Sequence, residues 1–282
     1  MAKVVTDSVS DLPPEVTRDL EITVIPLNVH FGTDTFRDGV DLDRSEFYRK
    51  LQASLVLPKT SSPSLGVFAE TFDRLAQKTN EILGLFLSKK FSTTYEAALQ
   101  GVNLMKSKCR VAVVDSTLGA MGQGLLVMEV AKKALCGASL DELMEAVVKT
   151  IPRVRVRASL ANLKYLVMGG RVGRAQALLA SALGIIPILG IKDGEAFPIT
   201  RLRSKAKASE WLYRFVTSCG RVKAVAVEYG TNIDEATALA KRIASVFPKV
   251  PLYLSQVNPV IGTHTGPETL IVSVLSAEES NA

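Results

Sequence analysis

The sequence is poor in the residues that build disulfide frameworks and zinc sites. Its 282 residues include three cysteines and two histidines, and no two cysteines form a CxxC pair. A disulfide scaffold needs a dense and even set of cysteines, and a structural zinc ion needs about four ligands in close pairs. We therefore expect no metal site, and inert thiols in a reducing, cytoplasmic compartment. The three thiols are those of Cys109, Cys136 and Cys219.

Long hydrophobic runs and an apolar leader are missing as well. The chain starts Met-Ala-Lys-Val-Val-Thr-Asp, so a charge precedes any apolar signal region. The two long uncharged stretches, Ala175–Ile191 and Val250–Pro267, are interrupted by glycine, proline and polar residues. A membrane span needs about 20 mostly apolar residues. We expect neither a leader nor stable membrane insertion.

Positive charge is too sparse for a nucleic-acid binder. Lys and Arg number 34 against 28 Asp and Glu, which leaves a net charge of +6. This mild excess is compatible with an anionic ligand, whereas nucleic-acid binders usually carry a strongly basic surface. Arg153, Arg155 and Arg157 alternate along a predicted strand and therefore share one face. We expect that face on a solvent-exposed edge strand, with anion binding as the alternative, and no nucleic-acid partner.

The chain is rich in apolar segments that alternate in type. With 47% hydrophobic residues it can fill a core, which excludes a disordered protein. In the first half, short β-branched runs alternate with amphipathic helical patterns, which is typical of βαβ units around a mostly parallel sheet. Strands are predicted at Lys3–Thr6, Ile22–Val29, Ile82–Leu87 and Val111–Val114, and helices at Pro13–Leu20, Glu46–Leu51, Pro63–Lys78, Thr94–Ser107 and between Gly122 and Thr150.

The second half departs from this regular alternation near Ile151. There, strands are mixed with single helices, and we read Ser159–Val167 and Ala175–Leu183 as helices. We predict an α/β protein with two domains, an N-terminal parallel-sheet α/β domain at residues 1–151 and a C-terminal mixed α/β domain at residues 152–282. The other segments of the mixed half are Ile185–Ile191, Glu195–Arg203, Ala224–Glu228, Glu235–Val246 and Leu252–Val257.

Four turns of the N-terminal domain are rich in hydroxyl and carboxyl side chains. The carboxyl ends of parallel strands form the ligand crevice of an open sheet, and a helix N-terminus attracts anions. The turns therefore predict an anion site, although ordinary helix capping explains each of them alone. Thr93 with Glu96 fits a capping box, and Ser62 before Pro63 fits a cap. The four turns are Thr6-Asp7-Ser8, Thr60–Ser64, Ser88–Thr94 and Asp115-Ser116-Thr117.

Familiar catalytic motifs are missing. No Gly-x-Ser-x-Gly and no Gly-x-x-x-x-Gly-Lys occurs, and Gly122-x-Gly124 lacks the third glycine of a dinucleotide site. His264 lies among glycines and threonines, which suits either a hydrogen bond to a ligand or a structural turn. Arg171 follows two glycines, and Arg201 and Arg203 share a strand face. Arginine binds carboxylate or phosphate through two donors, and surface solubility is the alternative.

The stretch Leu178–Ile191 is dominated by Leu, Ile and Ala. Such a run normally belongs to a hydrophobic core. The same kind of lining is what a long acyl chain would need. Both interpretations stay open on the sequence alone.

An ordered set of motifs runs along nearly the whole chain. Each motif alone is modest, but the ordered set resembles the DegV family of bacterial fatty-acid-binding proteins. The motifs are Val5-Thr6-Asp7-Ser8-Val9-Ser10-Asp11-Leu12-Pro13, Asp41-Leu42 with Glu46-Phe47-Tyr48, Thr60-Ser61-Ser62-Pro63-Ser64, Ser92-Thr93-Thr94-Tyr95, Asp115-Ser116, Gly169-Gly170-Arg171 and Val260-Ile261-Gly262-Thr263-His264-Thr265-Gly266-Pro267.

The resemblance implies two α/β domains with a long-chain fatty acid between them, its carboxylate near the surface, and no other cofactor. Thr60 and Ser92 match the residues that hold the carboxylate in the family, and His264 matches one beside the head group. Arg171 matches an arginine that supplies positive charge nearby. Better-studied members deliver the fatty acid to an ATP-dependent kinase subunit and hold the acyl phosphate that it makes. Further candidates in the vicinity of the head group or partner are Arg203, Ser61 and Thr265.

Four positions depart from the family pattern. Thr93 replaces a glycine after the binding serine, and Ile186 replaces a lysine before Pro187. Asn258 and Glu268 replace glycines that flank the histidine motif. We expect these changes to bear on chain preference and partner contact rather than on lipid binding.

The leading hypothesis is a non-catalytic protein of phospholipid metabolism. It binds a long-chain fatty acid and presents the carboxylate to a fatty acid kinase subunit. The alternative is an enzyme that acts on a small anionic substrate at the same crevice. In that alternative Asp7, Asp115 and His264 are the acid–base groups.

Overall fold

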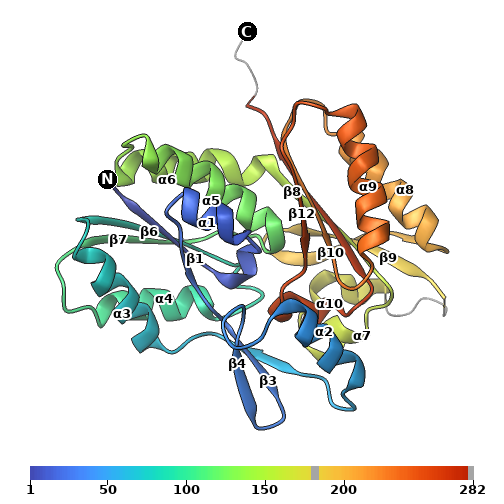
Figure 1. The fold of residues 1–282 in the computed structure, drawn as a ribbon, viewed down its shortest axis with the longest axis horizontal. Coiled ribbons are helices and arrows are strands. Elements are labelled where there is room, and N and C mark those ends of the chain that lie inside the picture. Colours follow the sequence, from blue (N-terminus) through green and yellow to red (C-terminus); the bar gives the residue numbers. More distant parts are fainter. Residues whose placement is uncertain (179–183, 279–282) are drawn as a thin grey trace.

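Two large β-sheets dominate the computed structural model, which describes residues 1–178 and 184–278 (Figure 1). The first sheet is built from the N-terminal half of the chain and the second from the C-terminal half. The first is all parallel and the second is mixed, so the predicted fold class is confirmed. The boundary between residues 151 and 152 stays a prediction; the chain passes there through the 3₁₀ turn η2 (Ile151–Arg153).

The first sheet has the strand order β2-β1-β6-β7. Its central strand β6 is buried on both faces, as the apolar run EILGLF predicts. Helices α3 and α4 cover one face, and α5 and α6 lie on the other (Figure 1). The elements are β1 (Lys3–Asp7), η1 (Ser8–Ser10), α1 (Pro14–Asp19), β2 (Thr23–Ile25), α3 (Leu65–Ala76), β6 (Glu81–Phe86), α4 (Thr94–Asn103), β7 (Arg110–Asp115), α5 (Ala120–Leu135) and α6 (Leu140–Thr150).

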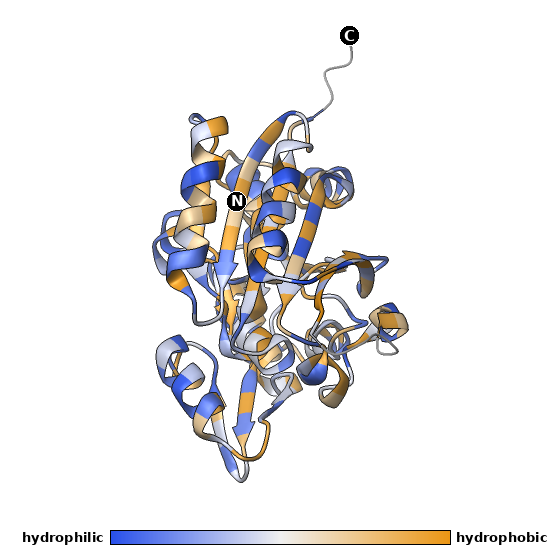
Figure 2. Ribbon diagram, turned by 90° about the vertical axis from the view of Figure 1, so that its right-hand side faces the viewer, coloured by the Kyte–Doolittle hydropathy of each residue, from blue (hydrophilic) through white to orange (hydrophobic). Residues whose placement is uncertain are grey.

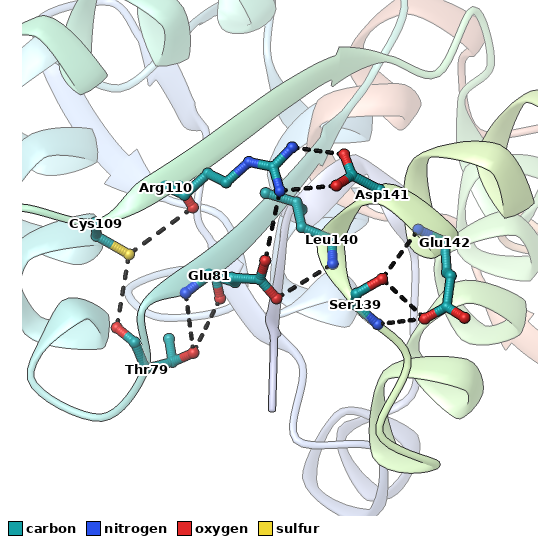
Figure 3. Close-up of polar contacts among 8 residues, drawn as sticks. All are labelled: Thr79, Glu81, Cys109, Arg110, Ser139, Leu140, Asp141 and Glu142. Atoms are coloured by element: carbon teal, nitrogen blue, oxygen red, sulfur yellow. Dashed lines mark hydrogen bonds and ion pairs between the residues drawn. The ribbon is translucent and has the colours of Figure 1, made fainter.

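The start of α6 is fastened to the edge of this sheet (Figure 3). Ser139 and Glu142 form a capping box, in which Ser139 N donates to Glu142 Oε2 at 2.8 Å. Arg110 bridges Asp141 at 2.5 Å and Glu81 at 3.6 Å. Such charged contacts at an exposed edge add little stability individually, but they fix the helix relative to the strands.

The predicted strand Ile22–Val29 is two strands in two sheets. β2 ends at Ile25 and the next strand starts at Asn28, on the far side of Pro26, because proline has no N–H for a sheet ladder. The second piece joins a small antiparallel sheet of order β4-β3-β5. Its elements are β3 (Asn28–Phe31), β4 (Asp34–Arg37) and β5 (Lys59–Ser61), with α2 (Arg44–Ala53) between the last two.

The second sheet has the order β10-β9-β8-β13-β11-β12, in which β11 and β12 are parallel neighbours and the other adjacent pairs are antiparallel. Hydrophobic and hydrophilic bands alternate along its long strands and outer helices (Figure 2). Helices α8 and α9 cover its outer face (Figure 1). The elements are β8 (Val154–Leu160), α7 (Lys164–Met168), η3 (Gly173–Leu178), β9 (Ile186–Lys192), β10 (Glu195–Leu202), α8 (Lys205–Thr217), β11 (Val222–Tyr229), α9 (Ile233–Val246), β12 (Leu252–Gln256), α10 (Pro259–Thr265) and β13 (Thr269–Ser276).

The prediction for the three alternating arginines is wrong. β8 lies inside the sheet between β9 and β13, so the arginine face is not on an edge strand. The guanidinium of Arg157 lies 4.8 Å from the centre of the Phe215 ring on α8, and that of Arg155 lies 6.0 Å from it. Arg153 donates to the carbonyl of Ser276 at 3.0 Å. Arg155 and Arg157 therefore join α8 to β8 through cation–π contacts that replace solvent, and Arg153 joins β13 to the start of β8.

Two helix predictions next to β8 also need correction. The predicted helix Ser159–Val167 is wrong in its first part, because β8 continues through Leu160. The predicted helix Ala175–Leu183 falls on the 3₁₀ helix η3 up to Leu178, and its residues 179–183 lie outside the described part of the chain.

Helix α5 packs between the two sheets and explains the Gly122-x-Gly124 pair. A Cβ on Gly122 would lie 2.3 Å from a methyl of Val156 in β8. A Cβ on Gly124 would lie 2.4 Å from the carbonyl oxygen of Ser10 in η1. The glycines are therefore sites of close packing of α5 against both halves of the molecule.

Candidate functional site

A cavity of about 300 Å³ lies between the two sheets. That volume is at the small end of the range of about 300–1,000 Å³ for ligand pockets. Residues from both halves line it, and the lining is apolar except at one end. The apolar lining comprises Val9, Leu27, Leu87, Phe91, Ala120, Val156, Ala158, Leu160, Leu166, Leu189, Ile191, Ala196, Val260, Ile261 and Ile271. The polar end comprises Thr60, Ser61, Ser62, Ser92, Thr93, Arg171, His264 and Thr265.

Thr60 and His264 meet at the polar end although they are 204 residues apart. Thr60 Oγ1 lies 2.8 Å from His264 Nε2. Thr60 is held in β5 by pairing with Val29 of β3, and His264 lies in the last turn of α10. The N-terminus of α10 is capped by Asn258, whose side chain accepts from Ile261 N at 2.8 Å. The site therefore needs both halves of the chain.

Burial keeps His264 neutral. It lowers the pKa of His264 to about 4, and the positive charge of Arg171 lowers it further. The Nδ1 atom is buried and has no hydrogen-bond partner in the described part of the chain. An unpaired buried N–H donor is rarer than an unpaired acceptor, which favours the tautomer with the proton on Nε2. His264 then donates to Thr60 Oγ1, and the Thr60 hydroxyl proton is left for a ligand.

Ser92 and Ser62 bring more hydroxyls to the same end. Ser92 Oγ lies 2.8 Å from Thr94 Oγ1, just before α4. Ser62 Oγ lies 3.1 Å from Thr93 Oγ1. Hydroxyls can donate to a carboxylate without burying a second charge beside it. This end of the cavity is therefore suited to an anionic group.

Arg171 lies at the polar end with its guanidinium held by main-chain carbonyls. Its Nε donates to Phe91 O at 2.9 Å and its Nη1 donates to Gly169 O at 2.6 Å. A Cβ on Gly169 would lie 2.1 Å from His264 Nδ1. Glycine is therefore required at position 169, because the backbone that leads to Arg171 passes close to the His264 imidazole. The geometry thus fixes one positive charge beside the hydroxyls.

The structure gathers six of the seven predicted site residues. Thr60, Ser61, Ser92, Arg171, His264 and Thr265 all line the cavity. Ser61 also bonds His30, with Oγ 2.9 Å from Nε2. Arg203 is exposed just beyond β10 and is not part of the described lining.

Only two of the four hydroxyl-rich turns reach this cavity. Asp7 and Asp115 lie outside its described lining and are used by the backbone. Asp7 accepts from Leu87 N at 2.8 Å and Val9 N at 3.0 Å, and Asp115 accepts from Thr117 N at 2.8 Å. Burial raises the pKa of Asp7 to about 6. The structure therefore does not bring Asp7, Asp115 and His264 together as an acid–base set.

The two caps predicted at the turns that reach the cavity are not formed. Helix α4 has Thr93 at its N-cap position, but the Thr93 side chain makes no capping bond. Helix α3 has Ser64, not Ser62, at its N-cap position, also without a side-chain bond. Ser92 Oγ instead accepts from Thr94 N, at the start of α4, at 3.3 Å, so Ser92 both lines the cavity and supports the helix start.

The four residues that depart from the family pattern differ in whether they reach the cavity. Thr93 is at the polar end, next to Ser62, and Asn258 caps the helix of His264. Glu268 pairs with Lys205 at 2.9 Å. Ile186 begins β9 and is outside the described lining. Only Thr93 can therefore touch a ligand in this cavity directly.

Sequence reasoning missed most of the apolar wall. Of the stretch Leu178–Ile191, the segment Leu189–Ile191 lines the cavity. The rest of the wall includes β8 residues Val156 and Ala158, whose alternation with arginines was the signal that could have found them.

Among the described residues there is no group of His, Cys, Asp and Glu that could hold a metal ion, and no described helix is long and apolar enough to cross a bilayer.

Comparison with known proteins gives one consistent family. The model described as "Uncharacterised protein, DegV family" matches residues 1–277. A DegV domain-containing protein of Caldanaerobacter subterraneus is 32% identical over 268 residues, which cover 94% of this chain and 95% of that protein.

Solved structures of similar chains agree with the fold. DegV of Bacillus subtilis, described as a fatty acid binding protein, superposes with a TM-score of 0.91 at 27% identity and covers 98% of this chain and 99% of its own. A stearic acid-binding protein of Eubacterium ventriosum superposes with a TM-score of 0.90 at 26% identity and covers 98% of both chains. The similarity of fold therefore extends through both sheets.

Proposed function

This chain belongs to the DegV family, and we propose that it binds a long-chain fatty acid in the cavity between its two sheets. The observation that carries the proposal is the form of the cavity, which is apolar along its length and lined by hydroxyls at one end. Two solved relatives are described as binding a fatty acid or stearic acid. A carboxylate on a long alkyl tail is the ligand that matches both parts of the lining.

The tail supplies most of the affinity in this account. Burying about 14 methylenes at about 0.8 kcal/mol each gives an upper figure of about 11 kcal/mol, before ordering costs. Each hydrogen bond to a charged head group adds about 1.5–3 kcal/mol. The apolar wall therefore retains the ligand, and the polar end fixes its position and direction.

Thr60, Ser92 and His264 hold the carboxylate in this proposal. Neutral His264 donates to Thr60, and Thr60 and Ser92 donate their hydroxyl protons to the two carboxylate oxygens. Arg171 adds a positive charge in the vicinity, with Ser61 and Thr265 beside it. All of these side chains except Ser61 are half-buried, so the carboxylate lies near the surface.

A carboxylate near the surface can be reached by a second protein. We propose that the chain does no chemistry itself and presents the carboxylate to an ATP-dependent kinase subunit in the cytoplasm. There a carboxylate oxygen attacks the γ-phosphorus of ATP, the bond to the β-phosphate oxygen breaks, and acyl phosphate and ADP form. Arg171 is placed to stabilise the added negative charge, and exposed Arg203 is a candidate contact for the partner.

The enzyme alternative has less support. It needs acid–base groups at the cavity, but Asp7 and Asp115 lie outside the described lining and accept hydrogen bonds from backbone N–H groups. The cavity is also mostly apolar, which a small anionic substrate does not need.

Removing the two hydroxyls tests the head-group assignment. Thr60→Val with Ser92→Ala keeps the side-chain shapes but deletes two donors, so fatty acid affinity should fall at least about 100-fold. The measurement is a titration of delipidated protein with a long-chain fatty acid. Ser64→Ala removes an exposed hydroxyl four residues from Thr60 and should leave the affinity unchanged. Equal affinities of the double variant and the control would contradict the assignment.

Arg171→Gln separates binding from presentation. We expect fatty acid affinity to change less than the rate of acyl phosphate formation with ATP and a fatty acid kinase subunit. Equal losses in both measurements would contradict this division of roles.

A further inference from the structure

A second cavity, of about 480 Å³, lies on the other side of the η1 turn. Val9 of η1 lines the fatty acid cavity, whereas its neighbours Ser8 and Ser10 line the second one. No residue is shared between the two described linings. The walls of the second cavity come from the start of α1, from the turn between β4 and α2, and from β12.

Asp38 is the unusual residue of this cavity. It is 5% exposed, and its Oδ2 is buried with no hydrogen-bond partner among residues 1–178 and 184–278. Asp38 lies in the turn between β4 and α2, where its own N–H is bonded to Leu27 O at 2.9 Å. A buried carboxylate oxygen without a partner is unfavourable, and native proteins keep few of them. A donor from outside the chain would satisfy it.

Arg44, the arginine in the lining of this cavity, already has partners. Arg44 Nη2 lies 3.0 Å from Asp11 Oδ1, and Arg44 Nη1 donates to Gln256 O. The other Asp11 oxygen accepts from Asn258 N at 3.3 Å. Arg44 thus pairs with Asp11, and no cation of residues 1–178 and 184–278 forms an ion pair with Asp38.

The balance of charge in the lining is negative. Three acidic residues, Asp11, Glu15 and Asp38, face one arginine, Arg44, in a chain whose net charge is +6. A cavity with this balance attracts a cation. Ser255 adds a second acceptor, because its buried Oγ has no partner in the described part of the chain.

The remaining wall of the cavity is apolar. It suits a short alkyl group rather than a hydrated inorganic ion, and the described residues contain no group of metal ligands. The apolar residues are Leu12, Pro13, Pro14, Val24, Pro26, Val40 and Leu254.

We propose that this second cavity binds a small primary alkylammonium ion, with the Asp38 carboxylate as its counter-ion and the Ser255 hydroxyl as a further acceptor. Because Asp38 Oδ2 is buried, the carboxylate must turn toward the cavity to accept from the ammonium N–H groups, and the alkyl group then lies along the proline-rich wall. The site is separate from the fatty acid cavity and does not depend on the function proposed for it.

The electrostatics of Asp38 agree with this assignment. Burial raises the pKa of Asp38 to about 7, and the negative charges of Asp11 and Asp7 also raise it. A hydrogen bond from Ser8 and the charge of Arg44 act in the opposite direction. A bound cation stabilises the ionised carboxylate, so binding is tested at pH 8.

The test is a titration of the full chain with n-butylammonium, followed by amide NMR. The wild-type protein should show saturable shifts at Gly39 and Ser255. Asp38→Asn keeps the shape of the side chain and removes its charge, so the affinity should fall about 10- to 100-fold. Asp34→Asn removes the same charge from an exposed position of the same hairpin and should bind as the wild type does. Ser255→Ala should lose a smaller factor, about 3- to 10-fold.

Two comparisons make the result decisive. Tetramethylammonium carries the same charge but no N–H donor, and it should bind at least 10-fold more weakly than n-butylammonium. The Thr60→Val, Ser92→Ala variant should bind n-butylammonium unchanged, so the two sites can fail independently. The proposal is overturned by an absence of saturable shifts, by equal binding to folded Asp38→Asn, by equal binding of tetramethylammonium, or by a loss in the fatty acid variant.

Discussion

The two cavities on either side of η1 (Ser8–Ser10) carry opposite kinds of polar group. The cavity proposed to bind a fatty acid has hydroxyls, a neutral imidazole and one arginine held by carbonyls. The other cavity has carboxyls and one arginine that pairs with Asp11. Both sets flank the same turn, which follows the parallel strand β1. The first set offers donors and therefore suits an anion. The second set leaves acceptors unsatisfied and therefore suits a cation.

The position of a turn next to a parallel strand does not by itself determine the charge of the ligand that binds there. Open parallel sheets bind ligands at the carboxyl ends of their strands, but the charge of the ligand depends on which polar side chains of the turns already have hydrogen-bond partners. Asp7 accepts three hydrogen bonds and is structural, whereas Asp38 keeps an oxygen without a partner among the described residues. Two aspartates near one turn thus have different roles.

Filling the apolar cavity should give the largest effect, and only on one side of η1. Ala158→Phe places a ring among the wall residues of β8 and displaces about four or five methylenes of the tail. At about 0.8 kcal/mol each, fatty acid affinity should fall about 100- to 1,000-fold. The measurement is a titration with a long-chain fatty acid. Ala206→Phe, at an exposed position on α8, is the control, and similar affinities in the two variants would contradict the position of the tail.

A substitution that displaces the η1 turn should affect both cavities, because η1 lies between them. A Cβ at Gly124 would lie 2.4 Å from Ser10 O and 2.9 Å from the sulfur of Met121, so the turn or the helix must shift. Gly124→Ala should lower the free energy of unfolding by about 1–3 kcal/mol, as overpacking does. Denaturant unfolding measures it. Gly137→Ala is unsuitable as a control because of its positive φ, whereas a Cβ on Gly66 would meet Ser64 Oγ at an ordinary contact distance of 3.8 Å, so Gly66→Ala should change stability little. Equal stabilities of the two variants would show that η1 is not tightly packed.

The side with the carboxyls should respond to pH through Asp38. Its pKa is raised to about 7, so the folded chain binds this proton more tightly than the unfolded chain, and stability falls as pH rises from about 4 to 7. Burial raises the pKa of Asp38 most, and the negative charges of Asp11 and Asp7 raise it further. A hydrogen bond from Ser8 and the positive charge of Arg44 lower it. Asp38→Asn should therefore gain about 1–2 kcal/mol over the wild type at pH 8 and much less at pH 5. Unfolding at both pH values measures this, and a gain that does not depend on pH would contradict it.

The fatty acid side should respond to pH in the opposite direction. The pKa of His264 is lowered to about 4, so the unfolded chain binds this proton more tightly, and stability rises with pH between about 4 and 6.5. A bound carboxylate stabilises the imidazolium, so loading with fatty acid should raise the pKa of His264. The chain has two histidines, so NMR titration of the ring protons resolves both, and His30→Gln assigns them. An unchanged His264 pKa on loading would place the carboxylate elsewhere.

The parallel half of the fold could be predicted because its signals are local. The buried strand Glu81–Phe86 and the helices around it follow from apolar period and from strand–helix alternation. The strand Ile22–Val29 was predicted as one element because the apolar pattern continues through Pro26, and only the sheet partners show where the chain changes sheets.

The mixed half was harder because its strand order is not sequential. β8 pairs with β13, which lies at the other end of the C-terminal half of the sequence, so the residues around Arg155 and Arg157 carry no sign that α8 covers them. The arginine alternation looked like a solvent face, but the aromatic ring of Phe215 takes the place of water.

The residues at the polar end of the cavity could be predicted from the sequence, but the contacts that bring them together could not. Thr60, Ser92 and His264 follow from hydroxyl-rich turns and a family resemblance, and the structure brings them to one cavity end. The second cavity could not be predicted, because Asp38 in an Asp-Gly turn gives the same sequence signal whether it is exposed or buried.

The central claim is that the cavity between the sheets holds a long-chain fatty acid. Native mass spectrometry of freshly purified protein, followed by denaturing extraction, tests it most directly. We expect one long-chain fatty acid per chain, lost on denaturation and reduced in the Thr60→Val, Ser92→Ala variant. A chain that is purified without ligand and stays without it after incubation with long-chain fatty acids would contradict the proposed ligand.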